Sequence, residues 1–255
     1  MDSLDYRIRK FLPLPESHAV VLDASAGLSL GALAGLDDFH AALQLLLPHL
    51  DGLVCSPGQL RRMGNRTRED GALMVRGDWT NTLRDKDFPL PPESATHISI
   101  LKAEDALELG ATAMVVSFLL GYEEAIEADC LKSTVQLALA GKELGLPLVV
   151  EVFPGGPRIS LPGKAAELGA SYALEGGADV IVVPYPGKES MHTIGAMLSV
   201  PWLLKPGSVE NSKGEWSEAL DLGASGLWLD HTWLNSISTL IEISGLVHKT
   251  QEGSG

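Results

Sequence analysis

Lys205 is the residue whose type and position point most directly to covalent chemistry. It ends the apolar run of residues 201–204, so its stem leaves a hydrophobic segment. A lysine surrounded by hydrocarbon has a lowered pKa, because burial disfavours the ammonium, and it can be a neutral amine near pH 7. Such an amine can add to a carbonyl and form a Schiff base. The alternative is a structural lysine paired with Asp230 or Glu151.

Two carboxylates are candidates for acid–base work beside this lysine. Glu151 lies in an otherwise apolar segment, residues 148–153, with the same strand parity as Phe153. A buried charge is costly unless it is paired, so Glu151 needs Lys205 or Arg76 as a partner, or stays protonated as a general acid. Asp23 ends another apolar segment. We therefore predict Lys205, Asp23 and Glu151 as the catalytic residues.

Further polar residues follow apolar segments and are predicted to bind the substrate: Arg76, Asp78, Ser117, Tyr185, Asp230 and His231. An imidazole at His231, oriented by Asp230, could exchange protons; alternatively Asp230 caps the helix that follows. Carboxylates from several segments could also hold a divalent cation. Their spacing matches no metal-binding motif, and we predict no metal and no other cofactor.

Eight short apolar segments position these residues. The expected strands are residues 19–23, 52–56, 72–76, 113–118, 148–153, 180–184, 202–205 and 226–230. Near-continuous apolar runs are typical of parallel strands that are covered on both faces. Helical patterns alternate with them; examples are residues 36–47, 103–109, 123–144, 163–175, 215–222 and 234–247. Eight such rounds predict an α/β fold, a (β/α)8 TIM barrel, whose site lies at the carboxyl ends of the strands.

The domain organisation follows from the same pattern. No linker or change in composition divides the chain, so residues 1–255 are expected to form one domain. An open doubly wound sheet is the alternative, but no Gly-x-Gly-x-x-Gly motif follows the first strand. Residues 77–99 are the one long irregular segment. A loop of this length in a compact domain is usually functional, so we expect a lid over the site, with a disordered surface loop as the alternative.

Composition narrows the partners. The net charge of −14 disfavours nucleic acid and anionic membranes, and the substrate is expected to be a small molecule. Two cysteines provide no disulfide framework, and Cys55 in its apolar run is expected to be a buried hydrophobe. No signal peptide and no membrane-spanning run is present, which favours the cytoplasm. Apolar helices would permit a homo-oligomer.

Three segments carry a family resemblance. Residues 21–25 (VLDAS) match an apolar run ending in Asp-His-Gly, residues 149–156 (VVEVFPGG) match a motif ending in Tyr-Pro-Arg-Gly, and residues 177–185 (GADVIVVPY) match Gly-Ala-Asp-x-x-Lys-x-x-Tyr. In order and spacing they resemble the archaeal-type class I fructose-bisphosphate aldolases of the deoxyribose-phosphate aldolase superfamily, from about residue 20 to residue 233. The resemblance implies a TIM barrel and a lyase, with Asp23 at a catalytic position.

The departures from that family concern its chemistry. The family's Schiff-base lysine corresponds to Val182, and its proton-transferring tyrosine to Phe153. The family's phosphate-binding turns correspond to Lys205-Pro206-Gly207 and Asp230-His231, where Asp230 would repel a phosphate. The resemblance therefore implies a divergent member with a rebuilt site around Lys205.

Three functional hypotheses follow. The first is an aldolase-like carbon–carbon lyase or synthase that acts on a small oxo or hydroxy metabolite, without the usual phosphates, through a Schiff base on Lys205. The second keeps the barrel but transfers protons without an imine, as an isomerase, dehydratase or cyclase would. The third is a non-catalytic relative that binds a ligand or partner, with the pocket filled by side chains and Lys205 in a salt bridge.

Overall fold

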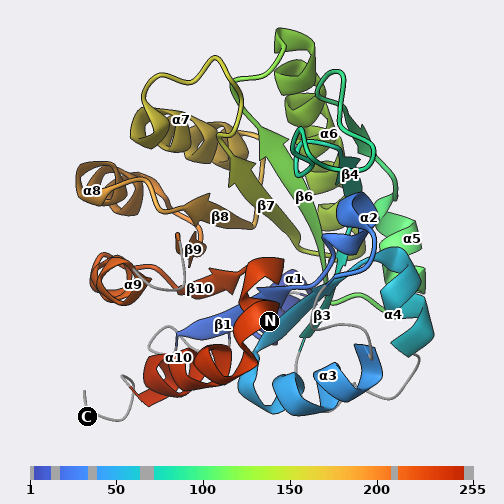
Figure 1. Cartoon of the computed structure of the whole chain (residues 1–255), viewed down its shortest axis with the longest axis vertical. Helices are drawn as coiled ribbons and strands as arrows, with labels where there is room; N and C mark the ends of the chain where they lie inside the picture. Colours follow the sequence, from blue (N-terminus) through green and yellow to red (C-terminus); the bar gives the residue numbers. More distant parts are fainter. Residues whose placement is uncertain (1–2, 13–17, 34–38, 64–71, 208–211, 250–255) are drawn as a thin grey trace.

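The centre of the molecule is a closed barrel of eight parallel strands. We describe it from a computed structural model that covers residues 3–12, 18–33, 39–63, 72–207 and 212–249. Around the barrel the strands follow one another in the order β1-β10-β9-β8-β7-β6-β3-β2 (Figure 1). Their bounds are β1 (Ala19–Asp23), β2 (Gly52–Cys55), β3 (Ala72–Arg76), β6 (Ala113–Leu119), β7 (Leu148–Phe153), β8 (Val180–Pro184), β9 (Trp202–Lys205) and β10 (Gly226–Leu229). The predicted α/β fold, a (β/α)8 TIM barrel, is confirmed, with all eight strands within one residue of the expected bounds.

Helices surround the barrel (Figure 1). Those near the expected ranges are α3 (Phe39–Leu46), α5 (Ala103–Glu108), α6 (Glu124–Leu144), α7 (Pro162–Glu175), α9 (Ser212–Asp221) and α10 (Ile237–Lys249). The expected last helix starts as a 3-10 turn, η3 (His231–Ser236), and the start of the expected helix 36–47 lies outside the described residues. Further helical segments are α1 (Ser3–Ile8), α2 (Gly27–Leu30), η1 (Leu47–His49), α4 (Pro57–Met63) and α8 (Lys188–Met197).

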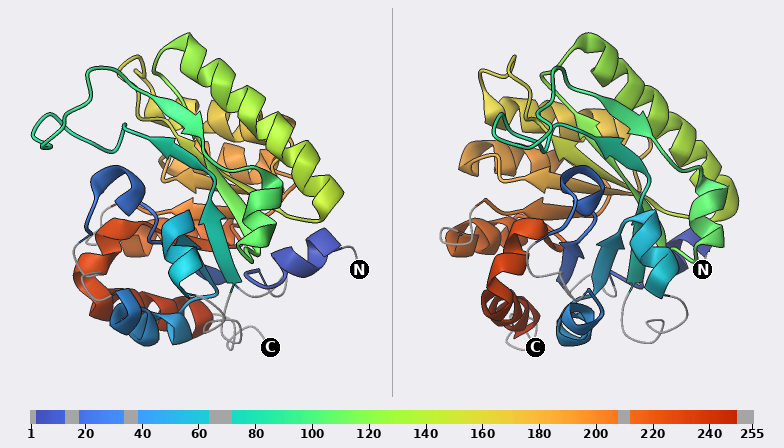
Figure 2. Two further views of the ribbon diagram at one scale, coloured as in Figure 1. Left: turned by 90° about the vertical axis from the view of Figure 1, so that its right-hand side faces the viewer. Right: turned by 45° about the vertical axis from the view of Figure 1, so that its right-hand side comes forward.

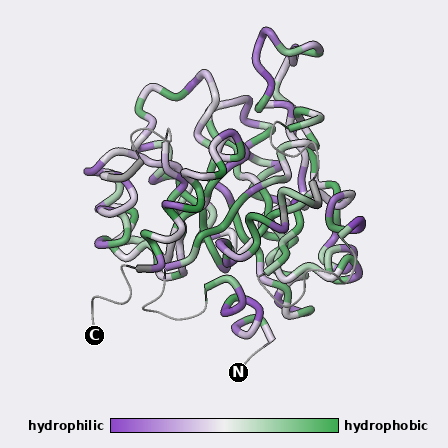
Figure 3. The backbone as a smooth tube through the Cα atoms, turned by 60° about the horizontal axis from the view of Figure 1, so that its bottom comes forward, coloured by the Kyte–Doolittle hydropathy of each residue, from purple (hydrophilic) through white to green (hydrophobic). Residues whose placement is uncertain are grey.

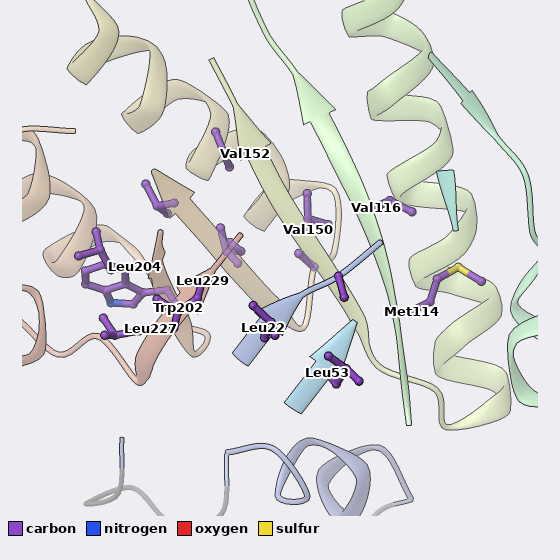
Figure 4. Packing of buried hydrophobic residues seen from close by; sticks show 14 of the residues in the cluster. Leu22, Leu53, Met114, Val116, Val150, Val152, Trp202, Leu204, Leu227 and Leu229 are labelled. Carbon is purple, nitrogen blue, oxygen red and sulfur yellow. The ribbon is translucent and has the colours of Figure 1, made fainter. Parts of the chain in front are cut away.

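Alternation along each strand divides the core into two clusters. Side chains of one parity pack between strands and helices; Figure 4 shows members of this outer cluster, among them Leu22, Val150 and Leu204. The other parity forms an inner cluster that includes Val21, Val149, Val182, Leu203 and Trp228. Successive strand residues point to opposite faces, so the inner cluster fills the barrel itself. Figure 3 shows the apolar segments gathered toward the middle of the molecule.

The segment after α1 closes the amino-terminal end of the barrel. Phe11 and Leu12 belong to the inner cluster, and Phe11 is fully buried. A Cβ placed on Gly52, the first residue of β2, would lie 3.4 Å from the Cβ of Phe11. With this end packed by side chains, the polar chemistry is confined to the opposite, carboxyl ends of the strands.

The expectation that residues 77–99 are irregular is wrong at both ends of the segment. Asp78–Thr80 (β4) and His97–Ser99 (β5) form an antiparallel pair outside the barrel sheet. The connection between them extends away from the barrel in Figure 2. Asp78, Thr80 and His97 of this ribbon are buried, so one face of it packs against the rest of the protein.

Candidate active site

Polar residues occupy inward-facing positions at or near the carboxyl ends of several barrel strands. Parity with the inner cluster assigns Asp23 on β1, Arg76 on β3, Ser117 on β6, Glu151 on β7 and Lys205 on β9 to the inside of the barrel. Below them the same strand faces are entirely apolar. The sequence therefore builds one polar layer at the carboxyl end of the barrel, which is where barrel enzymes place their chemistry.

These residues line one cavity of about 160 Å³. The site residues that the sequence analysis predicted and that line it are Asp23, Arg76, Asp78, Ser117, Glu151, Lys205, Asp230 and His231. Its remaining wall comes from Ser25, Ala26, Leu28, Ser29, Trp79, Thr80, Thr82, Leu83, Leu119 and Phe153. Of the predicted set, only Tyr185 lies elsewhere.

Arg76 stands at the centre of this layer. Its Nη2 donates to Asp23 Oδ2 and, over 2.8 Å, to Glu151 Oε2, while Nη1 donates to Ser117 Oγ at 3.2 Å. Its Nε donates to Ser25 Oγ at 3.2 Å. Burial alone would lower the pKa of Arg76, but the surrounding carboxylates outweigh it and raise the pKa. Arg76 is thus a fixed cation that orients its acidic neighbours.

Glu151 joins two cations. Besides Arg76, it accepts a hydrogen bond from Lys205 Nζ at 2.9 Å through Oε1. Burial raises the pKa of Glu151, but the charges of Lys205 and Arg76 outweigh this and lower it to about 2. Of the two alternatives for Glu151, the structure supports the paired carboxylate over the protonated general acid.

The expected lowered pKa of Lys205 is contradicted. Burial does act in that direction, but Glu151 at 2.9 Å and Asp230 at 3.5 Å outweigh it and raise the pKa of the amine. The hydrocarbon that precedes Lys205 in sequence covers only its stem, and the ammonium is surrounded by charges from β7 and from the end of β10. In this structure Lys205 is therefore a cation, and 18% of its side chain is exposed.

Asp23 is held as firmly as Glu151. Ser25 donates to Asp23 Oδ1 from its backbone nitrogen at 2.8 Å and from its hydroxyl at 2.5 Å, and Arg76 occupies Oδ2. Both oxygens have partners, so Asp23 fixes the position of Arg76 on the cavity wall.

Asp78 connects the cavity to a residue that the sequence analysis missed, His97. His97 Nε2 lies 2.9 Å from Asp78 Oδ2, and the Ser117 backbone nitrogen donates to the same oxygen at 2.6 Å. Burial lowers the pKa of His97, but the hydrogen bonds to Asp78 and Cys130 outweigh it and raise the pKa to about 10. The pair is thus ionic at neutral pH. In the sequence, only the alternation of polar and apolar residues over 97–99 indicates a strand here, and three residues are too few to predict one.

Asp230 and His231 follow the last barrel strand. Asp230 Oδ1 accepts from the Thr232 backbone nitrogen at 3.0 Å, so it caps the η3 turn, as one of the two alternatives predicted. Its Oδ2 lies 3.5 Å from Lys205 Nζ. His231 lines the cavity, but the described contacts of Asp230 lead to Thr232 and Lys205 rather than to His231.

Tyr185 lies beside the cavity. It packs against the outer cluster and lines an adjoining pocket of about 290 Å³ together with Phe153 and Lys205. On β8 the side chains of Val180 and Val182 point into the barrel. Tyr185, the residue after Pro184, has the opposite parity and is directed away from the barrel axis.

The β4–β5 hairpin supplies one wall of the cavity, including Trp79, Thr80 and Leu83. The Trp79 indole donates to the Leu28 carbonyl at 2.9 Å, which ties the hairpin to α2. Arg84 stacks over the Trp79 ring with 5.6 Å to its centroid. These contacts place the start of residues 77–99 over the site, as a lid would be, whereas closure of this segment stays a prediction.

Residues that could have supplied other chemistry are buried or paired. Val182, at the family's lysine position, is fully buried in the inner cluster, and Cys55 is fully buried, as expected. Burial, with a contribution from Asp23, raises the pKa of the Cys55 thiol. Within the described ranges no group of three His, Cys, Asp or Glu residues is arranged to hold a metal ion, and no helix is long and apolar enough to cross a membrane.

Known proteins resemble this chain in sequence over most of its length. An uncharacterized aldolase of Saccharolobus solfataricus is 26% identical over 83% of this chain and 82% of its own. A 2-amino-3,7-dideoxy-D-threo-hept-6-ulosonate synthase of Halobacterium salinarum is 26% identical over 86% of this chain and 78% of its own. A 3-hydroxy-5-phosphonooxypentane-2,4-dione thiolase of Shigella flexneri is 25% identical, covering 91% and 88%. No protein-family model matches the chain.

Solved structures agree in fold. An archaeal fructose 1,6-bisphosphate aldolase superposes with a TM-score of 0.78 at 19% identity, over 96% of this chain and 99% of that one. A Schiff-base-forming fructose-1,6-bisphosphate aldolase gives 0.77 at 20% identity, with the same coverage. The fold is the TIM barrel of these aldolases, with a polar layer at the carboxyl ends of its strands. The chain belongs to the aldolase-like superfamily.

Proposed function

We propose that this protein is an aldolase-like carbon–carbon lyase or synthase that acts on a small oxo or hydroxy metabolite without a phosphate group. The observation that carries the proposal is the Lys205 ammonium, which reaches the cavity from the end of β9 between Glu151 and Asp230. The similar proteins named above include an aldolase, a synthase and a thiolase, which supports the reaction class.

The charges of the cavity favour an unphosphorylated substrate. Four carboxylates, Asp23, Asp78, Glu151 and Asp230, line it together with two cations, Arg76 and Lys205. Both cations already have acidic partners, so a phosphate dianion would meet an excess of negative charge. The volume of about 160 Å³ also lies below the ~300–1,000 Å³ of sites for drug-sized ligands.

The geometry favours a cationic role for Lys205 over an imine. An amine must first lose its proton to attack a carbonyl, and here two carboxylates hold that proton in place. An ammonium can instead donate to the substrate carbonyl and stabilise the enolate oxygen that develops as the bond breaks. Arg76 and Glu151 would keep it aimed, while Glu151, with a pKa of about 2, is too weak a base to transfer protons near neutral pH.

His231 is the group on the cavity wall best suited to move a proton. In the cleavage direction, the His231 imidazole takes the proton of the β-hydroxyl, whose oxygen becomes the aldehyde oxygen. The Cα–Cβ bond breaks, and its electron pair forms the enolate at Lys205. The protonated imidazole then returns its proton to the enolate carbon, which restores the imidazole and releases the ketone.

Exchange of α-protons in D₂O tests this proposal without knowledge of the full substrate. Hydroxyacetone and 1,3-dihydroxyacetone are incubated with the protein and followed by proton NMR, and β-hydroxy ketones are then screened for cleavage. Loss of one donor to an enolate oxygen typically costs about 10²–10³ in rate, so Lys205→Met should show that loss and Lys205→Arg a smaller one. Lys132→Met, exposed on α6, is the matched control.

Borohydride separates the mechanisms. With ketone and borohydride present, we expect exchange to continue and no added mass at Lys205. A stable adduct on Lys205 would refute the ammonium role and support the Schiff base. Absence of exchange and of cleavage with every ketone, with the protein folded, would instead support the non-catalytic hypothesis.

A further inference from the structure

One oxygen of Asp78 has no hydrogen-bond partner among the described residues. The side chain is 2% exposed and lines the cavity, yet its Oδ1 accepts nothing. The nearest cation, Arg76 Nη1, lies 3.8 Å away, beyond hydrogen-bond distance. A buried carboxylate oxygen without a donor is costly, so its retention in an active-site wall calls for a ligand that completes it.

The other oxygen of Asp78 is saturated, so the carboxylate cannot simply rotate to satisfy Oδ1. Oδ2 accepts from the Ser117 backbone at 2.6 Å and from His97 Nε2 at 2.9 Å. His97 is itself fixed on its far side by Cys130, whose Sγ lies 3.5 Å from Nδ1. These contacts, which run from α6 through β5 to β4, therefore fix the Asp78 carboxylate in the cavity wall.

We propose that Asp78 Oδ1 accepts a hydrogen bond from a hydroxyl of the substrate, and that His97 positions the carboxylate for it. The inference rests on the proposed function for its site and names the substrate class as hydroxylated carbonyl compounds. A neutral hydroxyl suits the position better than an ammonium, because Arg76 and the His97 imidazole already bring positive charge to Asp78.

A series of ketones that differ only in hydroxyl number tests the inference by binding alone. Acetone, hydroxyacetone and 1,3-dihydroxyacetone are titrated against the full chain with ligand-observed NMR. A hydrogen bond to a buried charged group gives a preference of about tenfold to a hundredfold. We expect hydroxyacetone to bind more tightly than acetone by that factor. Equal affinity of the wild-type protein for the two ketones would overturn the inference, with no variant needed.

Asp78→Asn changes the oxygen in question with little change of shape. Its amide oxygen can still accept from Ser117 and His97, while the amide nitrogen takes the place of Oδ1 and turns an acceptor into a donor. The amide N–H can still donate to the hydroxyl oxygen, but the bond to a charged acceptor is lost, so the hydroxyacetone-to-acetone ratio should fall severalfold while some preference remains. An unchanged ratio in a folded variant, verified by circular dichroism, would show that Asp78 does not recognise the hydroxyl.

The positioning role of His97 has its own pair of variants. His97→Gln keeps a donor for Asp78 and should keep the hydroxyl preference, whereas His97→Leu removes the donor and should reduce it severalfold. Equal ratios in the two variants would refute that role.

Binding without turnover keeps the two proposals separable. If hydroxyacetone binds more tightly than acetone but no α-proton exchange occurs, the lyase proposal is refuted and the hydroxyl site at Asp78 is supported. Exchange without a hydroxyl preference would do the reverse.

Discussion

Glu151 allows a quantitative test of the charge network. Its pKa lies at about 2 in the folded chain, against 4.5 for an unperturbed glutamate as in the unfolded chain, and a displacement of this size corresponds to about 3 kcal/mol. Because the folded-state pKa is depressed, the contribution is fully present above pH 4.5 and is lost as the pH falls toward 2. Replacing Glu151 by Gln removes the ionisable group and strands Lys205 and Arg76 beside an uncharged amide.

The expected result is a pH-dependent difference in stability. At pH 7, Glu151→Gln should lower the free energy of unfolding by about 3 kcal/mol, within the range found when one partner of a buried pair is removed. At pH 2.5 about a quarter of the folded-state carboxyl groups are protonated and nearly all of those in the unfolded chain are, so the difference should shrink to a fraction of that value.

Urea unfolding followed by tryptophan fluorescence at pH 7, 5, 4 and 2.5 measures this difference, with the slope of free energy against urea compared between proteins. Glu143→Gln, exposed on α6, controls for loss of a surface charge and should follow the wild type. Parallel stability profiles for wild type and Glu151→Gln across the acid range would refute the network, because a depressed pKa must appear as a pH-dependent stability.

Two further predictions concern packing. Both thiols are buried, so Cys55 and Cys130 should resist a thiol reagent such as dithionitrobenzoate at pH 8 and react fully in urea; prompt reaction in the folded state would contradict their burial. Gly156→Ala should destabilise the protein by several kcal/mol, because its Cβ would fall 1.9 Å from the backbone carbon of Gly121. Gly214→Ala, with open space around it in α9, should be neutral or stabilise by up to about 1 kcal/mol in thermal unfolding; similar losses in both variants would contradict the close approach.

The barrel was predictable because its strands are buried on both faces. Such strands are continuous apolar runs, and a glycine at the end of the preceding helix often marks where a run begins. The strands at residues 180–184 and 202–205 were therefore predicted with their exact bounds. The polar layer followed for the same reason. A charged residue that ends an apolar run, such as Lys205 or Glu151, must lie at the carboxyl end of the barrel.

The charge and the partners of each side chain in the site were not predictable, since they depend on neighbours from other strands. The run before Lys205 suggested hydrocarbon around the amine, but barrel closure brings Glu151 and Asp230 to within 3.5 Å of it. The contact between Asp78 and His97 spans two three-residue strands that pair outside the barrel, where apolar periodicity carries little information. Tyr185 was predicted to line the cavity because it follows a strand end, but the parity of β8 directs its side chain away from the barrel axis.

Val182 and Lys205 lie on the neighbouring strands β8 and β9, and both lie beside Glu151. In strand register Glu151 lies opposite Val182, so an ammonium at residue 182 would project beside the same carboxylate that now binds Lys205. With Val182 buried in the inner cluster, the side-chain hydrogen-bond partners of Glu151 among the described residues are the cations Lys205 and Arg76. Valine at position 182 therefore leaves Glu151 paired, because the carboxylate takes its cations from Arg76 on β3 and Lys205 on β9.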